Sequence, residues 1–217
     1  MAQLGFRPPV VIEHAVGLGE GIRQVSYALG EEGITFVAAD YEQASLDGAR
    51  GELARDNLPR NTFFADPADI ADADTLLAYL DRQGIPTQGA VMVVGNGFHE
   101  VRGDDERLIR ALTRYREAGI TIVPIEQTAL TSRQMRASGW NTYNAGFTLV
   151  HEMSGQRIRP AYDLEDDAHR RTSWRAVARA AGYAVDDELS IGTRRIFPYA
   201  TDDEKNPPIS ITLVLRP

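Results

Sequence analysis

The chain has 217 residues, of which 43% are hydrophobic and 25% charged, a size and composition typical of one globular domain with a full core. A net charge of −8 without a basic run argues against a nucleic-acid partner, and no apolar stretch approaches the roughly 20 residues that cross a bilayer, so we expect no membrane partner. The absence of cysteine excludes disulfides, thiol catalysis and thiolate metal sites, and agrees with the cytoplasmic location that we expect.

Short apolar segments alternate with longer amphipathic ones over the first 125 residues. The short segments are rich in β-branched residues, as strands buried on both faces are. In chain order, we predict strands at 10–14, 34–39, 62–65, 90–94 and 120–125, separated by helices at 21–29, 44–56, 75–83 and 106–118. This alternation predicts right-handed crossovers and an α/β fold with a mostly parallel sheet between two layers of helices.

The pattern changes after residue 125. We expect a helical insertion at about 127–171 that covers the substrate at the carboxyl edge of the sheet. Thr172 and Ser173 then cap a helix that ends near Gly182, and strands near 194–199 and 209–215 close the chain as an antiparallel hairpin. Residues 1–217 are thus predicted to form a single Rossmann-like domain with a seven-stranded sheet.

A glycine turn follows the first strand, in the segment Glu13-His-Ala-Val-Gly17-Leu-Gly19, and the second strand ends at Asp40. Glycines let a backbone approach a ligand closely, and an acid at the end of the second strand can bind two ribose hydroxyls, so the pattern indicates an adenosine-containing cofactor. A dinucleotide site needs a third glycine where Ile22 stands, which disfavours a nicotinamide-dependent oxidoreductase. The alternative is an ordinary crossover that binds no ligand.

This segment resembles motif I of the class I S-adenosylmethionine-dependent methyltransferases, with Asp40 in the place of their ribose-binding acid. The family has a glycine where Ala15 stands, and a left-handed backbone would strain an alanine there. Family members usually carry helices before motif I, whereas nine residues precede the first predicted strand here. We expect either that the cover comes from later in the chain or, preferably, that this domain was cut from a larger protein.

Polar residues follow four of the predicted strands, and ligands of open α/β sheets bind at these carboxyl ends. The resemblance implies that Asp66 meets the adenine amino group of S-adenosylmethionine. The full set of expected cofactor-binding residues is Glu13, Ala15, Gly17, Gly19, Asp40, Tyr41, Asp66, Gly95 and Asn96. Each acid has a simpler alternative: Glu13 satisfies loop amides, Asp40 caps the next helix, and Asp66 begins a turn before a proline.

The segments Asn96-Gly-Phe-His99 and Pro124-Ile-Glu126 resemble those of carbon-methylating domains in polyketide and nonribosomal peptide synthases. By position, the resemblance implies that His99 is a base and Glu126 its orienting partner. A carbon next to a thioester carbonyl becomes nucleophilic only on deprotonation, and a carboxylate on one imidazole nitrogen fixes the tautomer that can remove the proton. Glu100 departs from the family, which usually has a small residue there. The alternative is an ordinary loop histidine.

We therefore predict an S-adenosylmethionine-dependent methyltransferase, preferably a C-methyltransferase of a carrier-bound or small-molecule carbon acid. Trp140, Tyr143 and Asn144 are expected to line the substrate site, with neighbouring synthase domains as further partners. An O- or N-methyltransferase of a small metabolite and a catalytically silent methyltransferase-like module are the alternatives. No metal site is expected, because His151-Glu152 lacks the second histidine of a zinc-binding helix.

Overall fold

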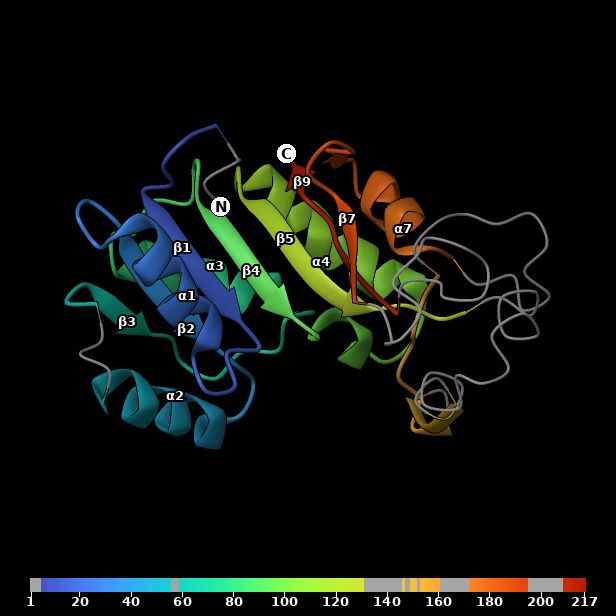
Figure 1. Ribbon diagram of the computed structural model, residues 1–217, viewed down its shortest axis with the longest axis horizontal. Coiled ribbons are helices and arrows are strands. Elements are labelled where there is room, and N and C mark those ends of the chain that lie inside the picture. Colours follow the sequence, from blue (N-terminus) through green and yellow to red (C-terminus); the bar gives the residue numbers. More distant parts are fainter. Residues whose placement is uncertain are drawn as a thin grey trace.

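A single mixed sheet forms the centre of the computed structural model, which describes residues 5–55, 59–130, 146, 149–151, 153–160, 172–194 and 209–217. The strands lie in the order β3-β2-β1-β4-β5-β8-β7, and the first five of these are parallel (Figure 1). The parallel strands are β1 (Val10–His14), β2 (Thr35–Ala39), β3 (Thr62–Phe64), β4 (Val91–Gly95) and β5 (Thr121–Gln127). The helices are α1 (Glu20–Leu29), α2 (Gln43–Arg55), α3 (Ala73–Arg82), α4 (Asp105–Glu117), α7 (Trp174–Ala180) and the short 3-10 helix η2 (Phe98–Glu100).

Both faces of the sheet carry helices, as predicted. The helices α1 and α2 lie on the face that Figure 1 presents, over β1, β2 and β3, and α3, α4 and α7 lie on the other face. In β1 the buried Val11 packs with the first pair of helices, whereas Val10 and Ile12 pack with the second group. Since neighbouring residues of a strand point to opposite faces, this two-sided burial explains why the strand is apolar throughout.

The predicted helices and parallel strands up to residue 127 are present, and their ends agree within two residues. This accuracy is lost in the closing part of the sheet, which consists of β6 (Ala184–Val185), β7 (Ile191–Arg194), β8 (Ser210–Thr212) and β9 (Leu215–Arg216). The strand expected at 194–199 begins earlier, as β7, and residues 195–199 lie outside the described part of the chain. The two-residue β6 was missed because so short a segment carries no periodic signal.

The predicted count of seven strands is wrong. The described residues form nine strand segments. Of these, β8 and β9 both pair antiparallel with β5, opposite Ile125 and Ile122 respectively, so they are two parts of one interrupted strand, and eight strands result if they are counted together. The antiparallel hairpin itself is present, since β7 pairs with β8.

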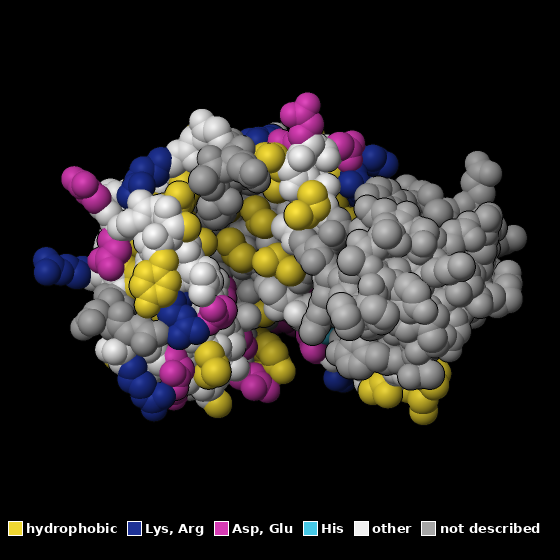
Figure 2. Space-filling model, viewed as in Figure 1, with side chains coloured by type: hydrophobic (Ala, Val, Ile, Leu, Met, Phe, Trp, Pro, Cys, Tyr) yellow, Lys and Arg dark blue, Asp and Glu magenta, His cyan; other side chains and the backbone are white. Residues whose placement is uncertain are grey.

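Most of the insertion expected at 127–171 lies outside the described residues. Within its described part, residues 149–151 are helical and Thr128 forms an isolated bridge with Arg159. Figure 2 shows that apolar side chains are gathered in the middle of the presented face, between the helices over β1 and the closing strands. Across the described residues, we find no helix with both the length and the apolar character that crossing a membrane requires.

Candidate functional site

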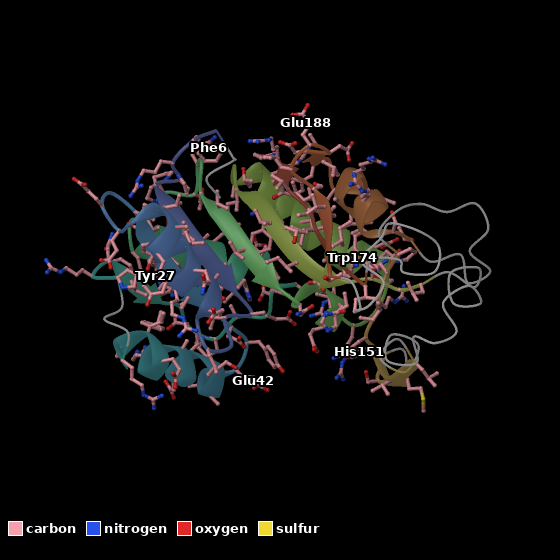
Figure 3. All side chains as sticks on the ribbon, viewed as in Figure 1. Phe6, Tyr27, Glu42, His151, Trp174 and Glu188 are labelled. Carbon is pink, nitrogen blue, oxygen red and sulfur yellow. The ribbon has the colours of Figure 1, made fainter. Side chains whose placement is uncertain are left out.

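A cavity of about 350 Å³ opens at the carboxyl edge of the sheet, next to the ends of β1 and β4. The chain continues to β2 on one side of β1, whereas β4 lies on its other side, so this is the topological switch point where open α/β sheets bind ligands. Figure 3 shows Glu42 and His151 beyond the strand ends at this edge, Glu42 beside α2 and His151 farther to the right. The cavity is lined by His14, Ala15, Tyr41, Asp69, Ile70, Gly97, Glu100, Val101, Arg102 and Arg107.

The glycine turn after β1 uses left-handed backbone at Ala15, Gly17 and Gly19, with φ of 58°, 51° and 79°. A Cβ at Gly17 would meet nothing within 4 Å, so the backbone there is open to a ligand, whereas one at Gly19 would meet the Leu53 side chain at 2.9 Å. Ala15 lines the cavity in a conformation that costs a non-glycine residue roughly 1–2 kcal/mol. The turn thus has an open backbone and one strained residue at the cavity wall.

Glu13 supports the start of α1. Its two carboxylate oxygens accept hydrogen bonds from the backbone N–H groups of Gly21 at 2.8 Å and Ile22 at 2.7 Å. Burial raises the pKa of Glu13 to about 7, although these two hydrogen bonds act to lower it. Glu13 does not line the cavity; its contacts are those of the simpler alternative, in which it satisfies loop amides.

Asp40 joins the loops that follow β1, β2 and β3. Its side chain is buried; one oxygen accepts a hydrogen bond from Glu42 N–H at 3.1 Å, the other from Gly17 N–H at 3.4 Å, and its carbonyl accepts one from Ala68 N–H at 2.8 Å. A carboxylate offers about four acceptor positions, so these contacts leave some of them unused, although Asp40, like Glu13, is not among the residues that line the cavity. The neighbouring Tyr41 is exposed and lines the cavity.

Two acids in the loop after β3 lie in different places. Asp66 is 71% exposed and forms an ion pair with Arg82 at 2.8 Å, and it does not line the cavity. Asp69 does line it, paired there with Arg107 at 2.7 Å. The acid that the structure brings to the cavity from this loop is therefore Asp69, three residues after the one expected from the sequence.

His14 ends β1 and forms part of the cavity wall. Its Nδ1 accepts a hydrogen bond from Ala15 N–H at 2.9 Å, so the neutral ring carries its proton on Nε2. That nitrogen is buried and has no hydrogen-bond partner among the described residues. Burial lowers the pKa of His14 to about 4, against a smaller opposing effect of the Asp69 charge, so the ring is neutral at pH 7.

Gly95 ends β4 and pairs with Ile125 of β5, and Asn96 begins the loop that follows. Asn96 has a φ of 55°, which asparagine tolerates better than most residues, and its N–H donates to Ile125 O at 2.8 Å. Gly97 follows and lines the cavity, where an added Cβ would lie 2.8 Å from that of Ala15. Two glycine-containing loops thus approach each other across the switch point.

His99 and Glu126 are brought into contact from η2 and β5. The His99 Nδ1 lies 2.9 Å from Glu126 Oε2, and the other carboxylate oxygen accepts the Phe98 N–H at 2.7 Å. Both side chains are buried, with 4% and 1% of their surfaces exposed. Burial by itself lowers the pKa of His99, but the hydrogen bond and charge of Glu126, aided by Glu100, outweigh it, so the pKa is raised above its ordinary value.

The expected substrate wall, Trp140, Tyr143 and Asn144, lies outside the described residues. Sequence reasoning missed several cavity residues, namely His14, Asp69, Ile70, Val101, Arg102 and Arg107. The spacing of Asp66 and Asp69 within one loop was the available signal for the second acid. Within the described part of the chain, no cluster of histidine and acidic side chains is arranged to hold a metal ion.

No family model and no curated protein matches the chain. Several solved structures do. The mitomycin 7-O-methyltransferase MmcR matches with a TM-score of 0.62 and 15% identity over 97% of this chain and 49% of its own. The CurJ carbon methyltransferase matches with a TM-score of 0.58 and 14% identity, over 100% of this chain and 50% of its own. An S-adenosylmethionine-dependent methyltransferase from Anabaena variabilis matches with a TM-score of 0.55 and 15% identity, over 99% and 80%.

The chain therefore spans about half the length of the first two of these proteins. All three share its architecture over nearly its full length. Because the sequence identities are low, this similarity establishes the fold and not the activity. The chain has the fold of S-adenosylmethionine-dependent methyltransferases.

Proposed function

We propose that the chain is an S-adenosylmethionine-dependent methyltransferase, preferably one that methylates carbon. The observation that carries this proposal is the position of the cavity, which lies at the switch point of a methyltransferase-like sheet and includes Glu100, the neighbour of the His99–Glu126 pair. The cofactor would approach the open backbone at Gly17, with Asp40 available to the ribose. When bound, it supplies an electrophilic methyl group on a positively charged sulfur.

The residues of the His99–Glu126 pair suit proton removal. Glu126 occupies the inner ring nitrogen of His99 with one oxygen and the Phe98 backbone with the other, which fixes the orientation of the imidazole. The outer nitrogen, Nε2, is then the atom that would accept a proton from a carbon acid. Such base catalysis contributes typically about 10²–10⁴-fold to a rate. An acceptor of this class, free or bound to a carrier protein, is the proposed substrate.

Cofactor binding is the first test. We expect titration calorimetry to show that S-adenosylhomocysteine binds the purified chain, and about a hundredfold excess over its dissociation constant should raise the free energy of unfolding by about 2.7 kcal/mol. Mass spectrometry of the protein as isolated would reveal any co-purified cofactor. Absence of binding would instead favour a catalytically silent module, with Ala15 as the first residue to examine.

A matched pair of variants locates the cofactor. Asp69→Asn is expected to weaken binding of S-adenosylhomocysteine by about tenfold, the loss of one charged hydrogen bond, whereas Asp66→Asn should leave it unchanged within about twofold. The two substitutions remove the same charge from the same loop, but only Asp69 lines the cavity. If Asp66→Asn weakened binding more than Asp69→Asn did, Asp66 and not Asp69 would be the acid that meets the adenine amino group.

The methyl acceptor is tested through His99. For a carbon acid, His99→Ala should lower methyl transfer by about 10²–10⁴-fold while the cofactor affinity stays within about threefold, because the imidazole acts only on the acceptor. The likeness to MmcR, an O-methyltransferase, supports the second candidate, an O- or N-methyltransferase of a small metabolite. An amine acceptor is already nucleophilic, so turnover that survives the substitution would point to that class.

The likeness to the CurJ carbon methyltransferase, of whose length the chain spans half, supports one further part of the proposal. We propose that this domain works beside neighbouring synthase domains that present the acceptor. Sequencing the gene on both sides of this segment tests that organisation. An isolated gene would leave a free small molecule as the substrate.

A further inference from the structure

The outer nitrogen of His99 also has a carboxylate beside it. Glu100 Oε1 lies 3.6 Å from His99 Nε2, too far for a hydrogen bond but close enough for a strong Coulombic interaction. His99 is therefore placed between two acids, with Glu126 at one ring nitrogen and Glu100 at the other. The groups facing it from the described elements are Glu126 of β5, Glu100 of η2 and the His151 ring, whose centroid lies 5.2 Å away.

Glu100 connects this pair with the cavity. Its side chain is 46% exposed and lines the cavity together with Tyr41 and Val101. Its second oxygen accepts a hydrogen bond from the Gln156 side chain, which fixes the carboxylate from the other side. His99 itself is not among the residues that line the cavity, so Glu100 is the side chain that touches both the cavity and the surroundings of the outer nitrogen, Nε2, of His99.

We propose that Glu100 is a positioning residue for His99. The Glu100 carboxylate, on the cavity side, stabilises a proton on the outer ring nitrogen of His99, Nε2. An imidazolium has no free electron pair, so His99 acts as a base only after the Nε2 proton has left. Glu100 therefore adds to the effect of Glu126 and raises the pH above which the base becomes available. This inference deepens the proposed function and rests on it for its catalytic meaning.

The test measures the pKa of His99 by ¹⁵N–¹H correlation of the imidazole rings in the full chain, with His99→Asn identifying its signal. Glu100→Gln is expected to lower this pKa by about 0.5–1 pH unit, less than for a buried partner because Glu100 is half-exposed. Glu106→Gln removes the same charge from an exposed side chain of α4 that pairs with Arg110. This control should shift the pKa of His99 by less than about 0.2 pH unit.

A second variant changes the position of Glu100 but no charge. Gln156→Ala removes the hydrogen bond on its other oxygen, and we expect a smaller fall in the pKa of His99. With a carbon-acid acceptor, Glu100→Gln should also move the rise of methyl transfer to lower pH.

A His99 pKa that is equal in Glu100→Gln and in the Glu106→Gln control would overturn the proposal. So would a rise of methyl transfer that stays at the same pH in Glu100→Gln as in the native chain. The pKa measurements by themselves are independent of cofactor binding. Failure of S-adenosylhomocysteine to bind the native chain would therefore refute the proposed function without changing the result for Glu100.

Discussion

Gly21 lies in the first turn of α1, directly against the buried carboxylate of Glu13. A Cβ there would stand 2.7 Å from Glu13 Oε1, so the carboxylate would have to leave the two N–H groups that it accepts. We expect Gly21→Ala to lower the free energy of unfolding by about 1–3 kcal/mol, the cost of leaving buried polar groups unpaired. Gly51→Ala in α2, where a Cβ meets nothing within 4 Å, should raise it by about 0.5–1 kcal/mol. Urea denaturation measures both, and equal effects would show that the carboxylate moves freely.

Ala15 is the residue at which the glycine turn departs from the pattern that it resembles. Its φ of 58° places a side chain in the left-handed region, so Ala15→Gly should raise the free energy of unfolding by about 1 kcal/mol. Ala44→Gly, at an exposed position in α2, should lower it by a similar amount of about 1 kcal/mol. A loss of stability in Ala15→Gly would mean that the contact of its methyl group with the Gly97 loop outweighs the strain.

The positions of single side chains were the least predictable feature from sequence. The resemblance paired His99 with Glu126, and the two side chains are in contact in the structure; their catalytic roles stay a prediction. Asp66 and Asp69 could not be told apart, since their directions depend on Arg82 and Arg107, which come from two different helices. Such pairings join residues that are far apart in the chain, and no local pattern encodes them.

At the scale of elements, the parallel strands and their helices were predictable because each is long enough to show its own periodicity. The closing strands are two to four residues long, and their pairing with β5 is decided by packing. Within β1, the last two buried residues are polar, and strand alternation sends Glu13 to α1 and His14 to the cavity. One strand thus supports a helix on one face and forms part of the site on the other.

This placement makes β1 sensitive to acid through His14. Its pKa is about 4 in the folded chain and 6.5 as the ordinary value, so stability is complete above 6.5 and falls as the pH drops toward 4. His14→Phe should be free of this loss. Between pH 7.5 and 4.5 the wild type should lose about 2 kcal/mol more than the variant in urea denaturation. Glu13 has the opposite pH dependence, but it is present in both proteins, so its contribution cancels in the difference between them. Equal losses of unfolding free energy in the wild type and in His14→Phe would show that His14 is not held neutral.

At the scale of the whole molecule, the two faces of the sheet are covered unequally. Helices α1 and α2 lie over β1, β2 and β3 on the face that Figure 1 presents, and no helix of the described residues lies over β5 and β7 there. Ile125, Thr212 and Ile191 are aligned across β5, β8 and β7 on this face, and both isoleucines are exposed. They belong to the side on which Figure 2 shows apolar groups gathered.

The double variant Ile125→Thr with Ile191→Thr tests whether this face carries any of the stability. Threonine keeps the β-branched shape, and both side chains already contact water, so the free energy of unfolding should change by less than about 1 kcal/mol. Ile122→Thr is the matched control, because it lies on the same strand but is fully buried on the opposite face, and it should cost about 2 kcal/mol or more. A comparable loss in both would mean that the isoleucine row is packed against another part of the protein in solution. A small loss in the double variant alone would assign the stability of the sheet to its helix-covered regions.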